Sequence, residues 1–240
     1  MEEIPLTCLS SPRHADKWLL EIKNQNKRCN LCYACAFSYL ENPHHLNLRK
    51  KYVLSILQNI LQTSPEIIVD IVNEDELISF HNIEVMLSLI KSSDSKIITL
   101  AGECLLLFLS HMKKEKFGLA VAQSLTVEVE ECEDYEQRFS HFVFLGRIFG
   151  LFPEFVPTIL NEHDKLLPIL ANGMTYPSED VKSAVIFLAL QIFSTEFSHK
   201  SQILSISDPL FSRGILSALK SSQSKAMMIN SLGIFSRFQL

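Results

Sequence analysis

The chain has 240 residues, of which 47% are hydrophobic and 20% charged, so it is long enough to bury a substantial core. Its formal net charge of −5 argues against a general nucleic-acid binder, because contact with many phosphates requires a surplus of Lys and Arg. The sequence opens without a basic, apolar leader, and polar residues interrupt its longest apolar runs. We therefore expect a soluble intracellular protein with reduced thiols, neither secreted nor transmembrane.

Helices joined by short turns are predicted along almost the whole chain. Only seven glycines occur, and several prolines fall between apolar blocks. No convincing strand alternation is present. Residues 1–14 are expected to be irregular. The expected helices are 15–41 (with a break near Asn30), 46–63, 65–72, 83–92, 95–112, 116–125, 135–151, 154–160, 165–171, 179–197, 209–220 and 224–238.

A helical face recurs with a period near 42 residues. In the block SDSKIITLAGECLLLFLS, apolar or small residues from Ile97 to Phe108 follow the i, i+3, i+4, i+7 spacing of one buried helical face. The block SEDVKSAVIFLALQIFST repeats this face 84 residues later, which is twice 42, and FSHFVFLGRIFG lies halfway between them. The segments LSLIKSSDSK and LSALKSSQSK share seven of ten residues at an offset of 129, about three periods.

This period is typical of armadillo and HEAT arrays, in which helix pairs stack because one pair cannot cover its own apolar face. The sequence therefore predicts an all-α fold, a right-handed α-solenoid of armadillo/HEAT-like repeats forming one domain over residues 1–240. The apolar residues expected to be buried between stacked pairs are Leu100, Leu106, Phe142, Ile148, Leu188, Leu190 and Leu232.

The last predicted helix is apolar and is followed by no polar capping repeat, which indicates a fragment or short form of a longer array. An uncapped helix leaves one face without a neighbouring helix. We expect that face to be exposed or covered by a partner, at Met228, Leu232, Phe235 and Phe238.

Three cysteines, Cys29, Cys32 and Cys35, precede the adjacent histidines His44 and His45. On a helix, the cysteines would share one buried face. A structural zinc site needs four ligands, and one of the two histidines would have to be the fourth. An iron–sulfur site would need a further cysteine near position 39, which is Tyr39. We therefore predict packing cysteines and no metal or cofactor; whether these thiols ever bind metal stays open.

Two kinds of charged run allow alternative interpretations. The acidic run EVEECEDYE is interpreted as a solvated loop between repeats, with a docking surface for a basic partner as the alternative; its carboxylates are Glu128, Glu130, Glu131, Glu133, Asp134 and Glu136. Basic clusters are interpreted as helix ends or polar faces. Direct nucleic-acid contact is the alternative if these basic residues converge on one groove: Arg49, Lys50, Lys51, Lys113, Lys114 and Lys116.

No enzymatic motif occurs: the sequence lacks GxGxxG, GxxxxGK[ST], GxSxG and HExxH. We expect a protein that is not an enzyme, without catalytic, cofactor-binding or metal residues. The preferred function is a scaffold that binds other proteins through the uncapped C-terminal helix and through a concave groove lined by residues 83–92, 116–125, 165–171 and 209–220. An armadillo/HEAT-type adaptor in another intracellular pathway is the alternative.

The segment ALKSSQSKAMMINSLGIFSRF, from Ala218, resembles a helix of the meiosis inhibitor protein 1 family. The shared positions are Leu219, Gln223, Lys225, Ile229, Asn230, Leu232 and Gly233. The segment DVKSAVIFL, from Asp180, is similar to the helix that precedes it in that family. The resemblance implies a non-enzymatic nuclear scaffold of armadillo-like repeats, needed for programmed meiotic DNA double-strand breaks and homologue synapsis. It also implies meiotic recombination proteins as partners and no catalytic residues.

Overall fold

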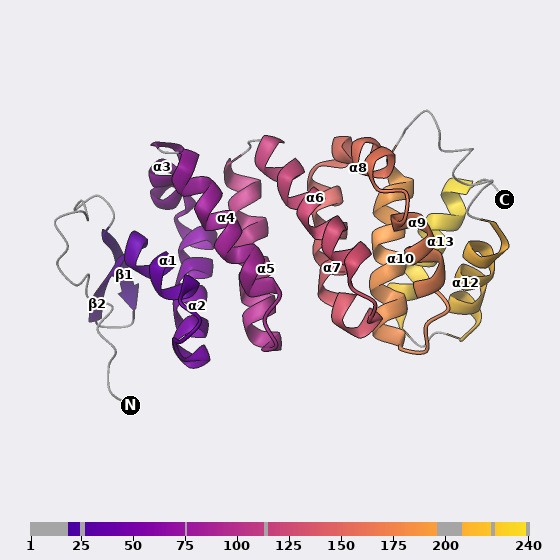
Figure 1. Ribbon diagram of the computed structural model, residues 1–240, viewed down its shortest axis with the longest axis horizontal. Coiled ribbons are helices and arrows are strands. Elements are labelled where there is room, and N and C mark those ends of the chain that lie inside the picture. The colour runs from indigo at the N-terminus through magenta and orange to yellow at the C-terminus, as the bar shows by residue number, and fades with distance from the viewer. Residues whose placement is uncertain are drawn as a thin grey trace. The chain divides into compact units, whose positions relative to one another are not determined.

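The computed structural model describes residues 19–24, 27–74, 76–112, 115–195, 208–221 and 224–238 (Figure 1). The chain divides into two compact units, Met1–Lys113 and Lys114–Leu240. Each unit is built of helices that pack in pairs, so the predicted all-α helical-repeat class is confirmed, with one short exception before the first helix. The region predicted to be irregular, 1–14, lies outside the described residues.

A β-hairpin is that exception. Strand β1 (Leu19–Asn24) pairs antiparallel with β2 (Lys27–Cys32), and Ile22 lies opposite Cys29. Helix α1 (Tyr33–Glu41) begins directly after Cys32. The helix predicted for 15–41 is therefore wrong before Tyr33. Both strands alternate apolar and polar residues over a few positions, a pattern too short to separate from a helical one by periodicity.

The remaining helices of the first unit are α2 (Asn47–Thr63), α3 (Pro65–Glu74), α4 (Glu76–Ile90) and α5 (Ser95–Met112). Helix α5 packs on α2 and α4, and α4 also packs on α1 and α3. The Tyr33 hydroxyl and the Asn82 amide form a buried hydrogen bond of 2.6 Å between α1 and α4. The Cys104 thiol donates to the Leu54 carbonyl at 3.5 Å, and burial raises the pKa of this thiol.

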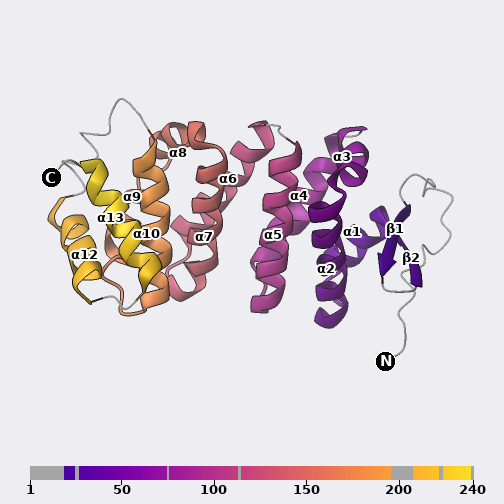
Figure 2. The same cartoon turned by 180° about the vertical axis from the view of Figure 1, so that it is seen from behind.

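The second unit contains two layers of helices. In one layer α10 (Glu179–Ser194) lies between α7 (Tyr135–Leu151) and α13 (Lys225–Phe238), as Figures 1 and 2 both show. In the other layer α9 (Leu166–Gly173) contacts α6 (Glu115–Glu131) and α12 (Asp208–Ser221). A short segment, η2 (Pro153–Phe155) and α8 (Val156–Glu162), follows α7 and contacts α6.

Polar N-caps mark the repeat. The side-chain oxygens of four capping residues accept backbone N–H groups in the first turns of α5, α7, α10 and α13: Asp94, Asp134, Ser178 and Ser224. The caps follow one another at intervals of 40, 44 and 46 residues. Such caps satisfy N–H groups that a helix leaves without an internal partner, so they fix where each helix begins. Their uneven spacing explains why the sequence repeat near 42 is not uniform.

Burial follows the predicted helical faces at most of the positions tested. Leu190 is half-buried rather than buried. Leu232 is 57% exposed, so its predicted burial is wrong, because it lies on the side of α13 that no described helix covers. The residues whose predicted burial is confirmed are Leu100, Leu106, Phe142, Ile148 and Leu188.

Helix α5 is long and apolar enough to cross a membrane by length and composition, and so is the bent pair formed by α7 with the segment Pro153–Glu162. The packing of α5 accounts for its composition, since 56% of its residues are buried inside the protein. A core helix passes the same test, so its apolar character is weak evidence for a membrane span.

Candidate functional site

The three N-terminal cysteines do not share a helix. Cys29 and Cys32 lie on β2, Cys32 is also the N-cap residue of α1, and Cys35 lies in the first turn of that helix. Cys32 is buried and Cys35 is half-buried. The predicted single helical face of cysteines is therefore wrong, because the chain is extended before Tyr33. Among the described residues, no group of three or more His, Cys, Asp and Glu side chains has the arrangement of a metal site.

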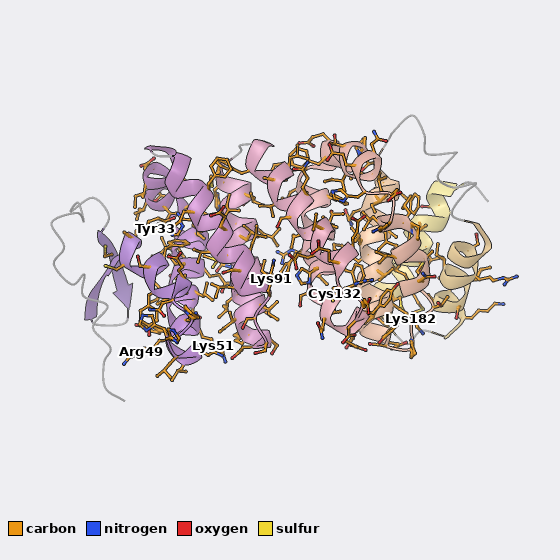
Figure 3. The ribbon with its side chains drawn as sticks, viewed as in Figure 1. Tyr33, Arg49, Lys51, Lys91, Cys132 and Lys182 are labelled. Carbon is orange, nitrogen blue, oxygen red and sulfur yellow. The ribbon has the colours of Figure 1, made fainter. Side chains whose placement is uncertain are left out.

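The basic cluster on α2 does not form a cationic patch. Arg49 is exposed, whereas Lys50 is buried on the core side of α2, and burial lowers the pKa of its ammonium group. The Lys51 Nζ lies 2.7 Å from Asp94 Oδ2. Figure 3 shows Arg49 and Lys51 at the same end of α2, but only Arg49 of the three is exposed. Lys113, Lys114 and the Lys116 side chain lie outside the described residues.

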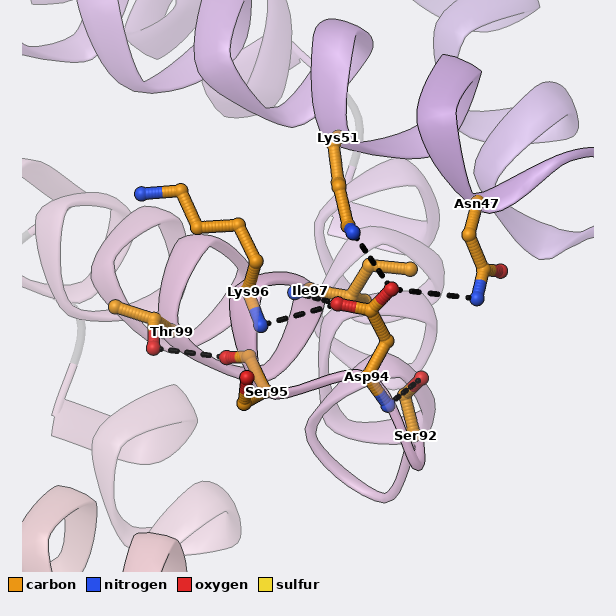
Figure 4. Close-up of polar contacts among 8 residues, drawn as sticks. All are labelled: Asn47, Lys51, Ser92, Asp94, Ser95, Lys96, Ile97 and Thr99. Carbon is orange, nitrogen blue, oxygen red and sulfur yellow. Dashed lines mark hydrogen bonds and ion pairs between the residues drawn. The ribbon is translucent and has the colours of Figure 1, made fainter.

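Asp94 is instead a structural junction between α2 and α5 (Figure 4). Its carboxylate accepts the backbone N–H groups of Lys96 and Ile97 and contacts the Asn47 amide at 3.5 Å, in addition to its ion pair with Lys51. The hydrogen bond from Lys51 is the main reason why the pKa of Asp94 is lowered. The cation of Lys51 is thus already paired within the protein and does not point to a nucleic-acid contact.

Part of the acidic run is helical rather than a solvated loop. Glu128, Glu130 and Glu131 lie in α6, and Glu136 lies in the first turn of α7. Glu130 Oε2 is 3.1 Å from His163 Nδ1 at the end of α8, and both side chains are mostly buried. The pairing with His163 turns Glu130 inward. The alternative of a six-carboxylate docking surface for a basic partner is therefore not supported at Glu130.

Within the second unit, α6, α9 and α12 correspond to helices that were predicted to line a binding groove. Their exposed residues change in character from one helix to the next. Those on α6 are apolar or acidic, at Val127 and Glu131, whereas those on α12 are basic and apolar, at Arg213, Leu216 and Lys220. Together, the exposed residues of these helices carry mixed charge and a few large apolar side chains, which is the composition of protein-binding surfaces rather than of a uniform phosphate-binding one. Their role as a groove stays a prediction.

Helix α13 exposes an apolar stripe, as the sequence predicted for the last helix. Ile229 is 66% exposed and Leu232 is 57% exposed, whereas Met228 is half-buried. The side chains of Phe235 and Phe238, also predicted to be exposed, lie outside the described residues. Ile229 was not predicted, although it lies three residues before Leu232 and therefore on the same helical face.

A second exposed apolar cluster was missed by the sequence analysis. Leu46, Leu48 and Tyr52 lie at the beginning of α2 and are among the most exposed large hydrophobic residues described. Their spacing of four residues, from Leu48 to Tyr52, could have indicated a second apolar face on α2 beside its core face. Next to them, the rings of Tyr39 and His45 stack at 3.8 Å, so His45 packs on α1.

Comparison with known proteins adds what the surfaces alone do not show. A family profile described as the meiosis inhibitor protein 1 N-terminal domain matches residues 31–239, almost the whole chain. The chain belongs to the meiosis inhibitor protein 1 N-terminal domain family. The family resemblance seen at the C-terminal end is thus confirmed and extends back to the end of the hairpin.

Two relatives of this family cover most of the chain. Human meiosis inhibitor protein 1 is 26% identical over 223 residues, which are 92% of this chain and 17% of the human protein. The mouse protein of the same name is 24% identical over the same shares of both chains. The chain therefore spans about one sixth of the length of these relatives.

One solved structure shares the helical fold, and a second gives a lower TM-score. A crystal structure of an engineered protein from the Northeast Structural Genomics Consortium superposes with a TM-score of 0.59 at 14% identity, covering 84% of this chain and 77% of that one. A designed armadillo repeat protein gives a TM-score of 0.46 at 12% identity, over 84% of this chain and 98% of that one. At such low identity, the first likeness shows a shared fold and says nothing about function.

Proposed function

We propose that this member of the meiosis inhibitor protein 1 family is a non-enzymatic protein-interaction scaffold that acts in meiosis. The observation that carries the proposal is the family match over residues 31–239, together with relatives that are named for meiosis. The more specific part is a nuclear role in forming programmed DNA double-strand breaks and in the homologue synapsis that depends on them. Its partners would be meiotic recombination proteins.

The exposed surfaces support a scaffold. Large apolar side chains reach solvent on α2, α12 and α13, and exposed apolar residues beside polar ones are typical of sites where proteins bind. Stacked helical repeats provide such surfaces without a catalytic cleft. The proposed binding regions are α4 in the first unit and, in the second unit, the exposed sides of α6, α9 and α12 and helix α13.

A rescue experiment in meiotic cells tests the proposal. Cells that lack the full-length protein would be supplied with the wild type, with Val127→Glu plus Leu216→Glu on the proposed groove face, or with the control Thr63→Glu at an exposed end of α2. We expect double-strand breaks and synapsis to return with the wild type and the control, and to stay low with the groove variant. Normal break numbers in cells without the protein would contradict the meiotic role.

Partner capture tests the scaffold separately. Recombination proteins should co-purify from meiotic nuclei with the wild type and be depleted with the groove variant, while both proteins keep the same helicity. If breaks fail without the protein but no recombination protein co-purifies with the wild type, the scaffold proposal is wrong.

A further inference from the structure

Two cysteines lie at the point where the chain changes from strand to helix. Cys32 ends β2 and is the N-cap of α1, with an extended backbone at ψ 119°. Helix α1 begins at Tyr33, so Cys35 is its third residue. The two residues form the sequence CYAC, a Cys-x-x-Cys motif at the start of a helix. Both are thiols in this structure.

The backbone brings Cys32 and Cys35 to the distance of a disulfide. An N-cap residue already lies on the helical path, since its carbonyl accepts the first hydrogen bond of the helix. Three residues along a helix advance about 4.5 Å and nearly complete one turn, so the two Cα atoms lie about 5 Å apart. Disulfide-bonded cysteines have Cα atoms roughly 4.4–6.8 Å apart. The side chains of an N-cap residue and of the third helical residue also meet over the first turn, as in a capping box.

Cys29 has the same sequence spacing from Cys32 but a different distance. Both residues lie on β2, where each residue advances about 3.3 Å, so their Cα atoms lie about 10 Å apart. Cysteines whose Cα atoms are more than about 7 Å apart cannot be joined without movement of the backbone. The change from strand to helix therefore leaves Cys32 and Cys35 as the one pair at bonding distance among these three equally spaced residues.

Exposure gives the two thiols different parts in a reaction. Cys32 has no exposed surface, whereas Cys35 is half-buried, so a small oxidant reaches Cys35 first. The positive end of a helix dipole favours the thiolate that attacks disulfides. The first turn of α1 contains no acidic residue that would oppose this effect. By contrast, the Cys104 thiol lies in the core and donates to the Leu54 carbonyl.

We propose that Cys32 and Cys35 are a redox-sensitive pair that forms a reversible disulfide, with a low-molecular-weight disulfide of the glutathione class as the oxidant. The Cys35 thiolate attacks one sulfur of the oxidant, forms a mixed disulfide and releases the first small thiol. The Cys32 thiolate then attacks the Cys35 sulfur, closes the intramolecular bond and releases the second small thiol. The two protein thiols lose two electrons and two protons, which convert one oxidant disulfide into two thiols.

The bond would act on the junction between the hairpin and α1 (Figure 1). Tyr33 lies between the two cysteines and ties α1 to α4 through its hydrogen bond with Asn82. A disulfide there closes a loop of only four residues, so it constrains the unfolded chain little. Its effect is to fix the turn by which β2 leads into α1. In a reducing compartment the pair stays as two thiols, as is usual for redox-sensing cysteines.

Equilibration of the intact chain in glutathione redox buffers tests the proposal. After acid quenching and alkylation of the remaining thiols, peptide mass spectrometry identifies the partner of each cysteine. We expect a Cys32–Cys35 disulfide to form in a single two-electron transition as oxidised glutathione increases, and to disappear when dithiothreitol is added. Its amount should not depend on protein concentration, because the bond lies within one chain. Absence of this bond in oxidised glutathione alone would overturn the proposal.

Substitutions separate the parts of the two thiols. Cys35→Ser should abolish the disulfide and leave Cys32 without a glutathione adduct, because Cys32 is buried. Cys32→Ala should instead trap glutathione on Cys35 as a stable mixed disulfide. The matched control Cys29→Ser should leave the midpoint of the transition unchanged. If Cys32→Ala loses helicity by circular dichroism, Cys35→Ser and the control still decide the result. A disulfide that includes Cys29, or a glutathione adduct on Cys32 in Cys35→Ser, contradicts the proposed pair.

Zinc is the other ligand that a Cys-x-x-Cys motif can serve. A structural zinc site needs four ligands, and among the residues that the structure describes no group of three or more His, Cys, Asp and Glu side chains is suitably placed. Protection of both thiols from alkylation by one zinc ion per chain, reversed by a chelator, would overturn the redox pair in favour of a metal site.

Discussion

The Lys51 ammonium lies 2.7 Å from the Asp94 carboxylate and thereby joins the beginning of α2 to the N-cap of α5. One residue of a turn thus both starts a helix and ties it to the neighbouring helix in the sequence repeat. Asp134, Ser178 and Ser224 cap α7, α10 and α13 in the same way.

Replacing Asp94 should separate its role as the N-cap of α5 from its role in the ion pair with Lys51. Asp94→Ala is expected to lower the thermal midpoint more than Asp94→Asn, because Asn retains capping ability and loses the charge. The pKa of Asp94 is lowered in the folded protein, mainly by the Lys51 hydrogen bond. Its charge therefore stabilises the fold above the ordinary carboxyl pKa of about 4, and this contribution disappears as the pH falls through the lowered value. Thermal melts at neutral and acidic pH would measure this; a pH-independent difference between wild type and Asp94→Asn would contradict it.

Leu188 and Leu232 test the assignment of buried and exposed faces. Leu188 has no exposed surface, so Leu188→Ala should cost about 2–5 kcal/mol of unfolding free energy through the cavity it leaves. Leu232→Ala should change that free energy by no more than about 0.5 kcal/mol, since Leu232 is largely exposed. Urea unfolding followed by circular dichroism measures both. Equal losses would mean that α13 is covered on both sides.

Gly146 and Gly150 test the close approach of α7 and α10. A Cβ atom at Gly146 would meet the Phe187 ring at 2.7 Å and the Leu188 backbone at 3.3 Å, so Gly146→Ala should destabilise by about 1–3 kcal/mol. At the exposed Gly150 the nearest atom is the mobile end of Gln191. Gly150→Ala should be neutral or stabilising by up to about 1 kcal/mol, because Ala favours the helix. Denaturant titrations of the two variants that showed the same sign would argue against this packing.

Tyr33 and Asn82 test the attachment of α1 to α4. Tyr33→Phe removes one partner of a buried 2.6 Å hydrogen bond and leaves the Asn82 amide without it, at an expected cost of about 1–3 kcal/mol. The double variant with Asn82→Leu should lose less than the sum of the single variants, because no polar group is then left unsatisfied. A double-mutant cycle in urea would reveal this coupling, and strict additivity would contradict the contact.

The cysteines test the absence of a metal function. Replacing Cys29, Cys32 and Cys35 together with Ala should lower the unfolding free energy, because Cys32 is buried, without changing the metal content. Elemental analysis of the purified wild type is expected to show no stoichiometric zinc or iron. One tightly bound zinc per chain, lost in the triple variant, would contradict this prediction.

Two helices were predicted with both ends correct, α5 at 95–112 and α7 at 135–151. Each combines a long apolar face with an acidic cap, Asp94 or Asp134, that lies immediately before it. Both signals are local, because a cap acts on the next turn and the face repeats every few residues. The α-helical class and the family resemblance depended on signals of the same kind.

Other features could not be predicted from residues that are neighbours in the sequence. The acidic end of α6 is helical where a loop was expected, and Glu130 there pairs with His163, 33 residues later. The hairpin before Tyr33 depends on pairing between two segments that are each too short to show a period.

The sequence by itself determined the helical repeat and most of the buried face, because these depend on residues within one or two turns of each other. Only the tertiary structure decided that Lys50 is buried and that Lys51 is paired, and it decided for exposure at Leu232, where the sequence had predicted both burial and an exposed face. A side chain's burial depends on which helix packs against it, and that neighbour comes from a distant part of the sequence. The same apolar pattern is therefore core on α7 and α10 and surface on α13.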